Sequence, residues 1–294
     1  MSNTSTTWTT DANTNASSSS STTWVEGSDY ETTSWSEEVT PVADAFTNSY
    51  SLYVDGTDDY LDLGDLDLIN TNDYSISIWF KTNNTSDEMV MISKGYTPRW
   101  KLYLDGDTDN KLKFEHRTSS GAVEIDSNSA LNDDEWHHAV ITADRDGLLL
   151  MYIDGTQQTD TASLNTDALK ETVYDASSGG NYDFVIGSYS RNLTKDWEDY
   201  IDEVAVFSGR VLSSANVTSF YNSGEPADLS SESSLSGYWR FEEGSGSTVE
   251  DSSTNSNTGT LQNNATFTSI VANTATAPST GRTAPTWVKD SNSQ

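Results

Sequence analysis

The middle of the chain is dominated by short runs in which apolar and polar residues alternate. Between Ser75 and Lys81, the side chains of Ile76, Ile78 and Phe80 fall on one face of an extended segment and the polar side chains on the other. Further runs of this kind are 101–104, 111–115, 139–142, 148–153, 184–186 and 201–207. Short period-two runs at this spacing predict an all-β fold, an antiparallel two-sheet sandwich.

Three of the predicted strands end in Asp-Gly: Asp55-Gly56, Asp105-Gly106 and Asp154-Gly155. Glycine adopts positive φ at little cost, so these pairs predict hairpin turns. One stretch has helical spacing instead, because residues 213–221 place Val217, Phe220 and Tyr221 on a common face. Gly224 is then expected to end this helix.

The first 49 residues have a different composition, rich in Ser and Thr and without Lys or Arg. Such a segment buries too little apolar area to fold alone, which predicts an extended arm. Trp8, Trp24 and Trp35 recur in similar Ser/Thr contexts. One hypothesis is that these indoles anchor the arm in pockets of a partner, and the other is a linker with incidental aromatic residues.

The sandwich is predicted over residues 50–222 and a polar C-terminal extension over residues 223–294. Within the extension, residues 235–243 are aromatic enough to add one strand to the sandwich or to a neighbouring subunit. Trp287 is a further candidate anchor. The expected architecture is therefore a sandwich with extended, mostly irregular N- and C-terminal arms.

Charge narrows the possible functions. Lys and Arg number 15 against 46 Asp and Glu, a formal net charge of −31. A chain this acidic repels nucleic-acid phosphates and anionic membrane surfaces. It has no cysteine and no apolar run of about 18–20 residues, so neither disulfides nor a transmembrane helix are expected. The first 30 residues lack an apolar stretch of the signal-peptide kind, so export by that route is not expected.

Several ordered pieces of the middle segment resemble the laminin-G-like jelly-roll domain of the concanavalin A-like lectin/glucanase superfamily. They are 51–56, 74–81, 92–95, 136–140, 151–155, 200–207 and 211–213, which include the sequences SISIWFK, WHHAV, MYIDG and YIDEVAVF. The resemblance implies a jelly roll. Residues 237–246, 251–253 and 257–260 are also similar to a stretch of this group.

That last stretch follows the final strand of the predicted sandwich. In this order of its pieces, the chain resembles jelly-roll proteins carried on the virions of tailed phages. This resemblance implies a non-enzymatic virion structural protein, of the capsid decoration or fibre type, assembled in the host cytoplasm. Its arms would attach it to other virion proteins or to sister subunits in a homo-oligomer. The alternative is a lectin or adhesin module that binds host-surface glycans.

Catalytic candidates are weak. The hydrolases of the superfamily carry Glu-x-Asp-x-Glu on one strand, whereas Glu124, Asp126 and Asn128 place an amide where the proton donor is needed. His137 and His138 are adjacent on a predicted strand and therefore point to opposite faces. We expect one of them to be packed and the other solvated, and no enzyme.

Two binding sites remain as candidates. Asp55, Asp58 and Asp59 cluster in one turn, and Asp202 could complete a Ca²⁺ site if the first strand lies beside its own. The alternative is that these carboxylates only shape and solvate the turn. For a glycan, the candidates in or beside predicted loops are Tyr96, Arg99, Trp100, Tyr189, Arg191 and Trp197. Trp100 and Trp197 could equally cap the ends of the sandwich.

Overall fold

The computed structural model describes residues 46–85, 88–95, 99–171, 182–190 and 192–270. Contacts divide the chain into a unit over Met1–Thr47 and a second unit from Asn48 onward, and every strand below belongs to the second. The proposed anchors Trp8, Trp24, Trp35 and Trp287 lie outside the described residues, so their role stays a prediction.

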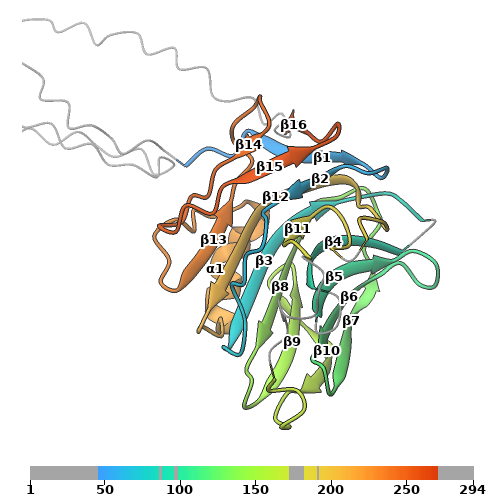
Figure 1. Cartoon of the computed structure of the whole chain (residues 1–294), viewed down its shortest axis with the longest axis vertical. Coiled ribbons are helices and arrows are strands. Elements are labelled where there is room, and N and C mark those ends of the chain that lie inside the picture. Colours follow the sequence, from blue (N-terminus) through green and yellow to red (C-terminus); the bar gives the residue numbers. More distant parts are fainter. Residues whose placement is uncertain (1–45, 86–87, 96–98, 172–181, 191, 271–294) are drawn as a thin grey trace, which may run out of the picture. The chain divides into compact units, whose positions relative to one another are not determined.

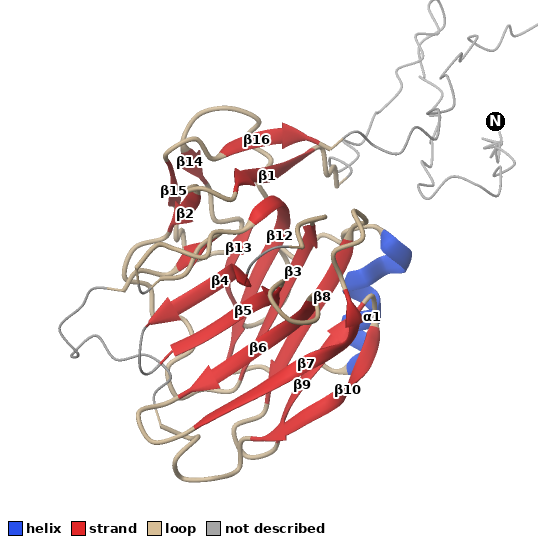
Figure 2. Ribbon diagram, turned by 90° about the vertical axis from the view of Figure 1, so that its right-hand side faces the viewer, coloured by secondary structure: helices blue, strands red, loops and turns tan. Residues whose placement is uncertain are grey.

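Two antiparallel sheets pack face to face, each with eight strands in the described part of the chain (Figures 1 and 2). The first has the order β10-β9-β8-β3-β12-β1-β16, with β13 also paired to β12. Its strands are β1 (Tyr50–Asp55), β3 (Tyr74–Lys81), β8 (His137–Ala143), β9 (Leu148–Ile153), β10 (Thr156–Ser163), β12 (Glu198–Ser208), β13 (Leu235–Trp239) and β16 (Thr266–Ser269). The predicted all-β sandwich is confirmed.

The second sheet has the order β14-β15-β2-β11-β4-β5-β6-β7. Its strands are β2 (Tyr60–Asp62), β4 (Glu88–Gly95), β5 (Arg99–Asp105), β6 (Lys111–Arg117), β7 (Ala122–Ala130), β11 (Val185–Ile186), β14 (Thr248–Val249) and β15 (Gly259–Gln262). The main core lies between the two sheets. We call the face of this sheet that points away from that core its outer face.

Strand β3 shows how alternation produces the core. Ile76, Ile78 and Phe80 face the second sheet and are fully buried, as the pattern predicts. The residues of the opposite face are buried as well, apart from Lys81 at the end of the strand. At Ser75 the segment that leads into the helix covers this face: Ser75 Oγ donates to the carbonyl of Arg210 at 3.0 Å and accepts from the amide of Leu212 at 3.0 Å.

The predicted helix is confirmed as α1 (Ser214–Tyr221), followed by a 3₁₀ turn over Asn222–Gly224. Ser213 caps its N-terminus in a reciprocal capping box with Asn216. Val217 and Phe220 are buried against the outer side of the first sheet, in a second, smaller core.

The three Asp-Gly turns differ. Asp154-Gly155 joins β9 to β10 with positive φ at both residues, as a two-residue hairpin requires. Asp105-Gly106 begins the β5–β6 hairpin, but its left-handed residue is Asn110. Asp55-Gly56 is not a hairpin turn, because β1 and β2 belong to different sheets. The alternation pattern does not reveal on which sheet a strand lies.

The described part of the C-terminal extension, up to residue 270, belongs to the sandwich. The predicted strand in 235–243 is confirmed as β13, which pairs with β12 of the same chain. Three further strands were not predicted: β14 and β15 extend the second sheet, and β16 pairs with β1. Figure 1 shows these C-terminal strands, in orange and red, at the same end of the molecule as the blue β1 and β2, with which β16 and β15 pair. The predicted boundary at residue 222 therefore does not separate two structural units.

A buried acidic pair in β12 lies where the extension meets the jelly roll. Glu203 has positive φ in a register shift of β12 against β3, and Tyr238 Oη and Arg240 Nε (3.3 Å) both donate to its carboxylate. Asp202 accepts from Asn48 Nδ2 at 2.9 Å. Burial raises the pKa of Glu203 to about 7, although Tyr238 and Arg240 act in the opposite direction. Burial and the neighbouring Glu203 carboxylate raise the pKa of Asp202 as well.

This burial predicts a pH dependence of stability. Because the folded chain holds the Glu203 proton more tightly than the unfolded chain, the contribution of this group is complete below pH 4.5 and is lost as the pH rises toward about 7. Glu203→Gln removes this ionisation, so the stability of the variant relative to wild type should increase by on the order of 3 kcal/mol between pH 4.5 and 8. Urea unfolding across that range measures it.

The control is Glu225→Gln, which changes an exposed carboxylate. A difference between Glu203→Gln and wild type that stays constant with pH would contradict the prediction, whatever its sign.

Candidate functional site

The segment 187–197, which connects β11 to β12, lies against the outer face of β4 and β5; we call it the covering loop. The amide of Gly187 donates to the carbonyl of Met91, and the amide of Val90 donates to the carbonyl of Lys195, both at 2.8 Å. Between these two ends, the buried Ser93 Oγ donates to the carbonyl of Ser188 at 3.0 Å. The loop is thus held through its backbone near both of its ends.

An aromatic contact reinforces this arrangement. Tyr189 packs with Val90 and Tyr103 in a small apolar cluster on the outer face, and it is 7% exposed. Lys101 Nζ lies 3.6 Å from the centre of the Tyr103 ring and Arg99 lies 6.0 Å from that of Tyr189. Tyr189 therefore holds the covering loop onto the sheet and shows little surface to a ligand.

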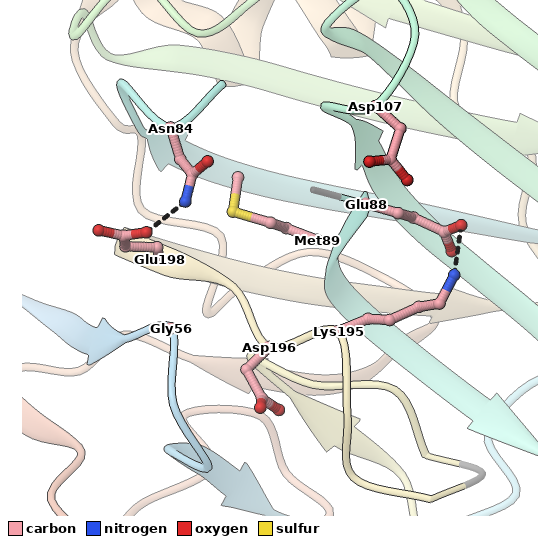
Figure 3. A pocket seen from close by; sticks show the side chains of 8 residues that line it. All are labelled: Gly56, Asn84, Glu88, Met89, Asp107, Lys195, Asp196 and Glu198. Carbon is pink, nitrogen blue, oxygen red and sulfur yellow. Dashed lines mark hydrogen bonds and ion pairs between the residues drawn. The ribbon is translucent and has the colours of Figure 1, made fainter. Parts of the chain in front are cut away.

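A pocket of about 360 Å³ lies on one side of the covering loop (Figure 3). Most of its lining is polar or charged: Gly56, Asn84, Glu88, Met89, Asp107, Lys195, Asp196 and Glu198. Figure 3 shows Glu198 bound by Asn84 on one side and Glu88 bound by Lys195 (2.6 Å) on the other. We call it the acidic pocket.

The carboxylates around this pocket have unequal environments. Burial acts to raise the pKa of Glu88, but hydrogen bonds from Lys101 and Lys195 outweigh it and lower that pKa. For Asp196, burial and the charges of Asp58 and Asp59 raise the pKa, although Ser188 donates to it at 2.5 Å. On the sheet side, the negative charge of Glu88 is thus balanced by two lysines. Beside the turn after β1, the carboxylates of Asp58, Asp59 and Asp196 concentrate negative charge.

That turn contains three of the four proposed calcium ligands. Asp59 is buried and accepts from the amides of Asp55 (3.3 Å) and Asn264 (2.7 Å), while the amide of Asp58 donates to Asp196. β1 and β12 are neighbours as expected, but Leu52 pairs with Ile201, so Asp202 lies near the start of β1 rather than beside Asp55. Among the described residues, no three acidic or histidine side chains are arranged to hold a metal ion. A Ca²⁺ site there stays a prediction.

A second pocket, of about 250 Å³, lies on the other side of the covering loop. Its lining combines two tyrosines with carboxylates, a hydroxyl and an amide: Tyr60, Asp62, Tyr182, Asp183, Val185, Ser190, Asn192 and Leu193. Both tyrosines are half-buried, and Leu193 is 40% exposed at the rim. We call it the tyrosine pocket.

The tyrosine pocket is built by β2, β11 and the covering loop together. Tyr60 and Asp62 flank the core residue Leu61 on β2, so both point to the outer face. Ser190 Oγ donates to the carbonyl of Asp183 at 2.6 Å, which joins the loop to the segment just before β11. Burial raises the pKa of both Tyr60 and Asp183, and the charge of Asp62 raises them further.

The proposed glycan residues are placed unevenly. Trp100 and Trp197 are 2% and 0% exposed and stack edge-on against Phe184 and Phe80, so they belong to the core. That burial corrects their assignment to a sugar-stacking surface, because an aromatic ring contacts a sugar only through an exposed face. Arg99 is held by Glu115. Tyr96 and Arg191 lie outside the described residues.

Sequence reasoning missed the residues of the tyrosine pocket. Tyr60 lies in β2, a strand of three residues, which is too short to show an alternation of apolar and polar residues. Tyr182 precedes β11, a strand of only two residues. It also missed a half-buried aromatic group on the first sheet. There the ring of Tyr200 lies 5.3 Å from Tyr53 and 6.1 Å from Trp136, with tilts of 53° and 49°. Rings tilted in this way form no flat platform.

The histidines and the Glu124 strand have structural roles. His138 is buried and stacks with Trp79 and Tyr221, whereas His137 is held by Asp154 and Asp133. The packed histidine of the expected pair is therefore His138, whereas His137 is not a solvated side chain, because it is only 12% exposed and bound by two carboxylates.

On β7, Glu124 accepts from Tyr103 at 2.5 Å, and Asn128 accepts from both the amide and the hydroxyl of Thr159. The position that would need a proton donor thus joins β7 to β10.

Among the described residues, no helix has the length and apolar character to cross a membrane.

The anchoring of the covering loop can be tested at Ser93. Its hydroxyl also accepts from the amide of Ser190 at 2.8 Å, so Ser93→Ala leaves two buried backbone groups without their partner. We expect the loop to open more readily by about 2 kcal/mol, seen as faster amide hydrogen exchange at Ser190 with β3 protection retained. Exchange unchanged at Ser190, or accelerated equally by the exposed control Ser214→Ala, would contradict this role.

Comparison with known proteins places this geometry in a family. No curated protein matches the sequence. Among solved structures, a Bacteroides ovatus protein to which carbohydrate binding is attributed has a TM-score of 0.58 at 14% identity, over 77% of this chain. This chain covers 61% of that protein's length.

Two other structures have lower scores. The CBM40 of Ruminococcus gnavus IT-sialidase bound to α2,3-sialyllactose has a TM-score of 0.47 at 16% identity, covering 58% of this chain and 95% of that one. A SAP-like pentraxin from Limulus polyphemus has 0.45 at 13%, covering 59% and 82%. The family model of the concanavalin A-like lectin/glucanases superfamily, in its laminin G form, matches residues 55–218, more than half of the chain. The chain therefore belongs to that superfamily.

Proposed function

We propose that this chain is a non-catalytic carbohydrate-binding module and that the tyrosine pocket is its sugar site. The observation that carries the proposal is the lining of that pocket: two half-buried tyrosine rings beside two carboxylates, an amide and a hydroxyl. The apolar face of a sugar ring stacks on an aromatic side chain, and its hydroxyls need acceptors and donors at the edge of the stack. The tyrosine pocket offers both the aromatic rings and the polar groups that a sugar needs.

The other surfaces fit a sugar less well. The acidic pocket has no aromatic ring in its lining, and Asn84–Glu198 and Lys195–Glu88 already use its polar groups on each other. The Tyr53–Tyr200–Trp136 group has rings but lies in neither pocket, and its rings are tilted. The fold shared with the Bacteroides ovatus protein adds support for carbohydrate binding as the function.

We propose that the module is non-catalytic because of a residue on strand β7. A glycoside hydrolase of this architecture needs an acid to protonate the leaving group, and the side chain at that position is Asn128, which is bound to Thr159. Attachment to a virion, a homo-oligomer and assembly in a host cytoplasm stay predictions of the sequence. The arms proposed to make those contacts lie outside the described residues.

The test is a glycan array with the full chain, followed by titration calorimetry of the best ligand. Tyr60→Ala and Tyr182→Ala each remove a stacking ring, so each should weaken binding by about tenfold or more. Circular dichroism checks that the variants remain folded.

Trp136→Ala is the matched control, because it removes a half-buried ring on the other sheet and should leave binding unchanged. Binding that is lost in Trp136→Ala and kept in both tyrosine variants would move the site to the first sheet. An array without any ligand, at high protein loading, would refute the proposed function.

A further inference from the structure

Half-buried aromatic residues form a row across the outer side of the first sheet. Tyr53 on β1 pairs with Tyr200 on β12, and Tyr200 pairs with Lys81 on β3. The pairing of β3 with β8 places Trp136 beside Lys81, just before β8 begins. All four residues are partly exposed, and Lys81 Nζ is bound to Asp134 at 3.1 Å. We call Tyr53, Tyr200 and Trp136 the aromatic row.

The alternation of side chains along the strands turns this row away from the main core. On β1, Leu52 and Val54 are core residues, so Tyr53 between them points to the opposite side of the sheet. On β12, Ile201 is a core residue and Tyr200 precedes it. The rings of Tyr53 and Tyr200 are 5.3 Å apart, so both lie on the outer side.

The end of helix α1 packs on the same side of the sheet, next to the row. The ring of Tyr221, at the last position of α1, stacks on Trp79 and His138, which are paired across β3 and β8. Lys81 and Trp136 lie two positions further along the same two strands. The row therefore begins where the cover of the helix ends, and its rings keep part of their surface exposed.

Carboxylates lie around the Tyr53 end of the row. Burial raises the pKa of Tyr53, and the charges of Asp199, Asp55 and Glu198 raise it further. Glu198 also lines the acidic pocket, which links the row to that pocket. A cationic group that contacts the rings would therefore have carboxylates beside it.

The tilt of the rings bears on what the row can bind. Tilts of 53° and 49° prevent the three rings from forming one flat surface for a sugar, but each ring can stack with a separate guanidinium group. In an extended peptide, alternate side chains are about 7 Å apart, close to the ring spacings of 5.3 Å and 6.1 Å. A carboxylate also accepts two parallel hydrogen bonds from one guanidinium.

We propose that the aromatic row and the carboxylates at its end dock a partner protein through an extended segment with arginine at alternate positions. The charge of such a segment is opposite to that of Asp55, Glu198 and Asp199 and to the net charge of −31 of the chain. The rings favour arginine over lysine, because a guanidinium stacks on an aromatic face whereas an ammonium is compact and strongly hydrated. Docking here does not depend on sugar binding, since the tyrosine pocket lies on the second sheet.

The test compares two labelled peptides of equal charge, acetylated and amidated RSRSR and KSKSK, in their binding to the full chain by fluorescence anisotropy. The ionic strength is about 0.15 M, so that charges more than about 8 Å away are largely screened. RSRSR should bind at least about fivefold more tightly than KSKSK.

Variants of the row then locate the binding. Trp136→Ala and Tyr200→Ala each remove one ring and should weaken the binding of RSRSR by about fivefold or more. Tyr200→Phe is the matched control, because it keeps the ring and should bind within about twofold of wild type. Asp199→Asn should weaken both peptides by about threefold, whereas Glu225→Gln, which changes an exposed carboxylate elsewhere, should not. Circular dichroism checks that the variants remain folded.

Three results would overturn the proposal. Equal affinities of RSRSR and KSKSK would show attraction by charge alone. Binding of RSRSR to Trp136→Ala and Tyr200→Ala at wild-type strength would place the peptide elsewhere on the chain. Failure of RSRSR to bind at millimolar concentration would remove the docking role altogether. None of these results changes the outcome of the glycan array, so the two proposals fail separately.

Discussion

The sandwich depends on strand β12 being hydrogen-bonded along both edges. β3 covers one edge, and the other is shared between β1, which pairs with its first half, and β13, which pairs with its second half. The register shift at Asp202 and Glu203 lies where one partner gives way to the other. A strand left unpaired there would expose backbone groups in the middle of the sheet, so the C-terminal extension completes the fold.

The position of β12 also fixes the candidate site. The covering loop leaves β11 in the second sheet and enters β12 in the first, so its two ends are set by different layers of the sandwich. Between those ends, Ser93 and Val90 hold its backbone and Tyr189 packs beneath it. Ser190 and Asn192 are therefore presented by a loop that is held near both of its ends, which reduces the entropic cost of binding a ligand.

The sequence predicts those parts of this molecule that depend on local periodicity. Strand β3 and helix α1 follow from the spacing of Ile76, Ile78, Val217 and Phe220, because a strand or helix that packs on a core must repeat its apolar residues. The additional strands β14, β15 and β16 have two to four residues each and are held by partners distant in sequence. No local pattern encodes such pairings.

The candidate site escaped prediction for a related reason. Tryptophans in loops are typical of sugar sites, yet Trp100 and Trp197 fill the core, while Tyr60 and Tyr182 become neighbours only when β2 pairs with β11. A large aromatic residue gains most free energy when fully buried, so its presence in a loop sequence says little about exposure. Half-buried tyrosines whose polar ends remain near solvent are the better indicator of a binding surface, and only the pairing of strands shows which tyrosines those are.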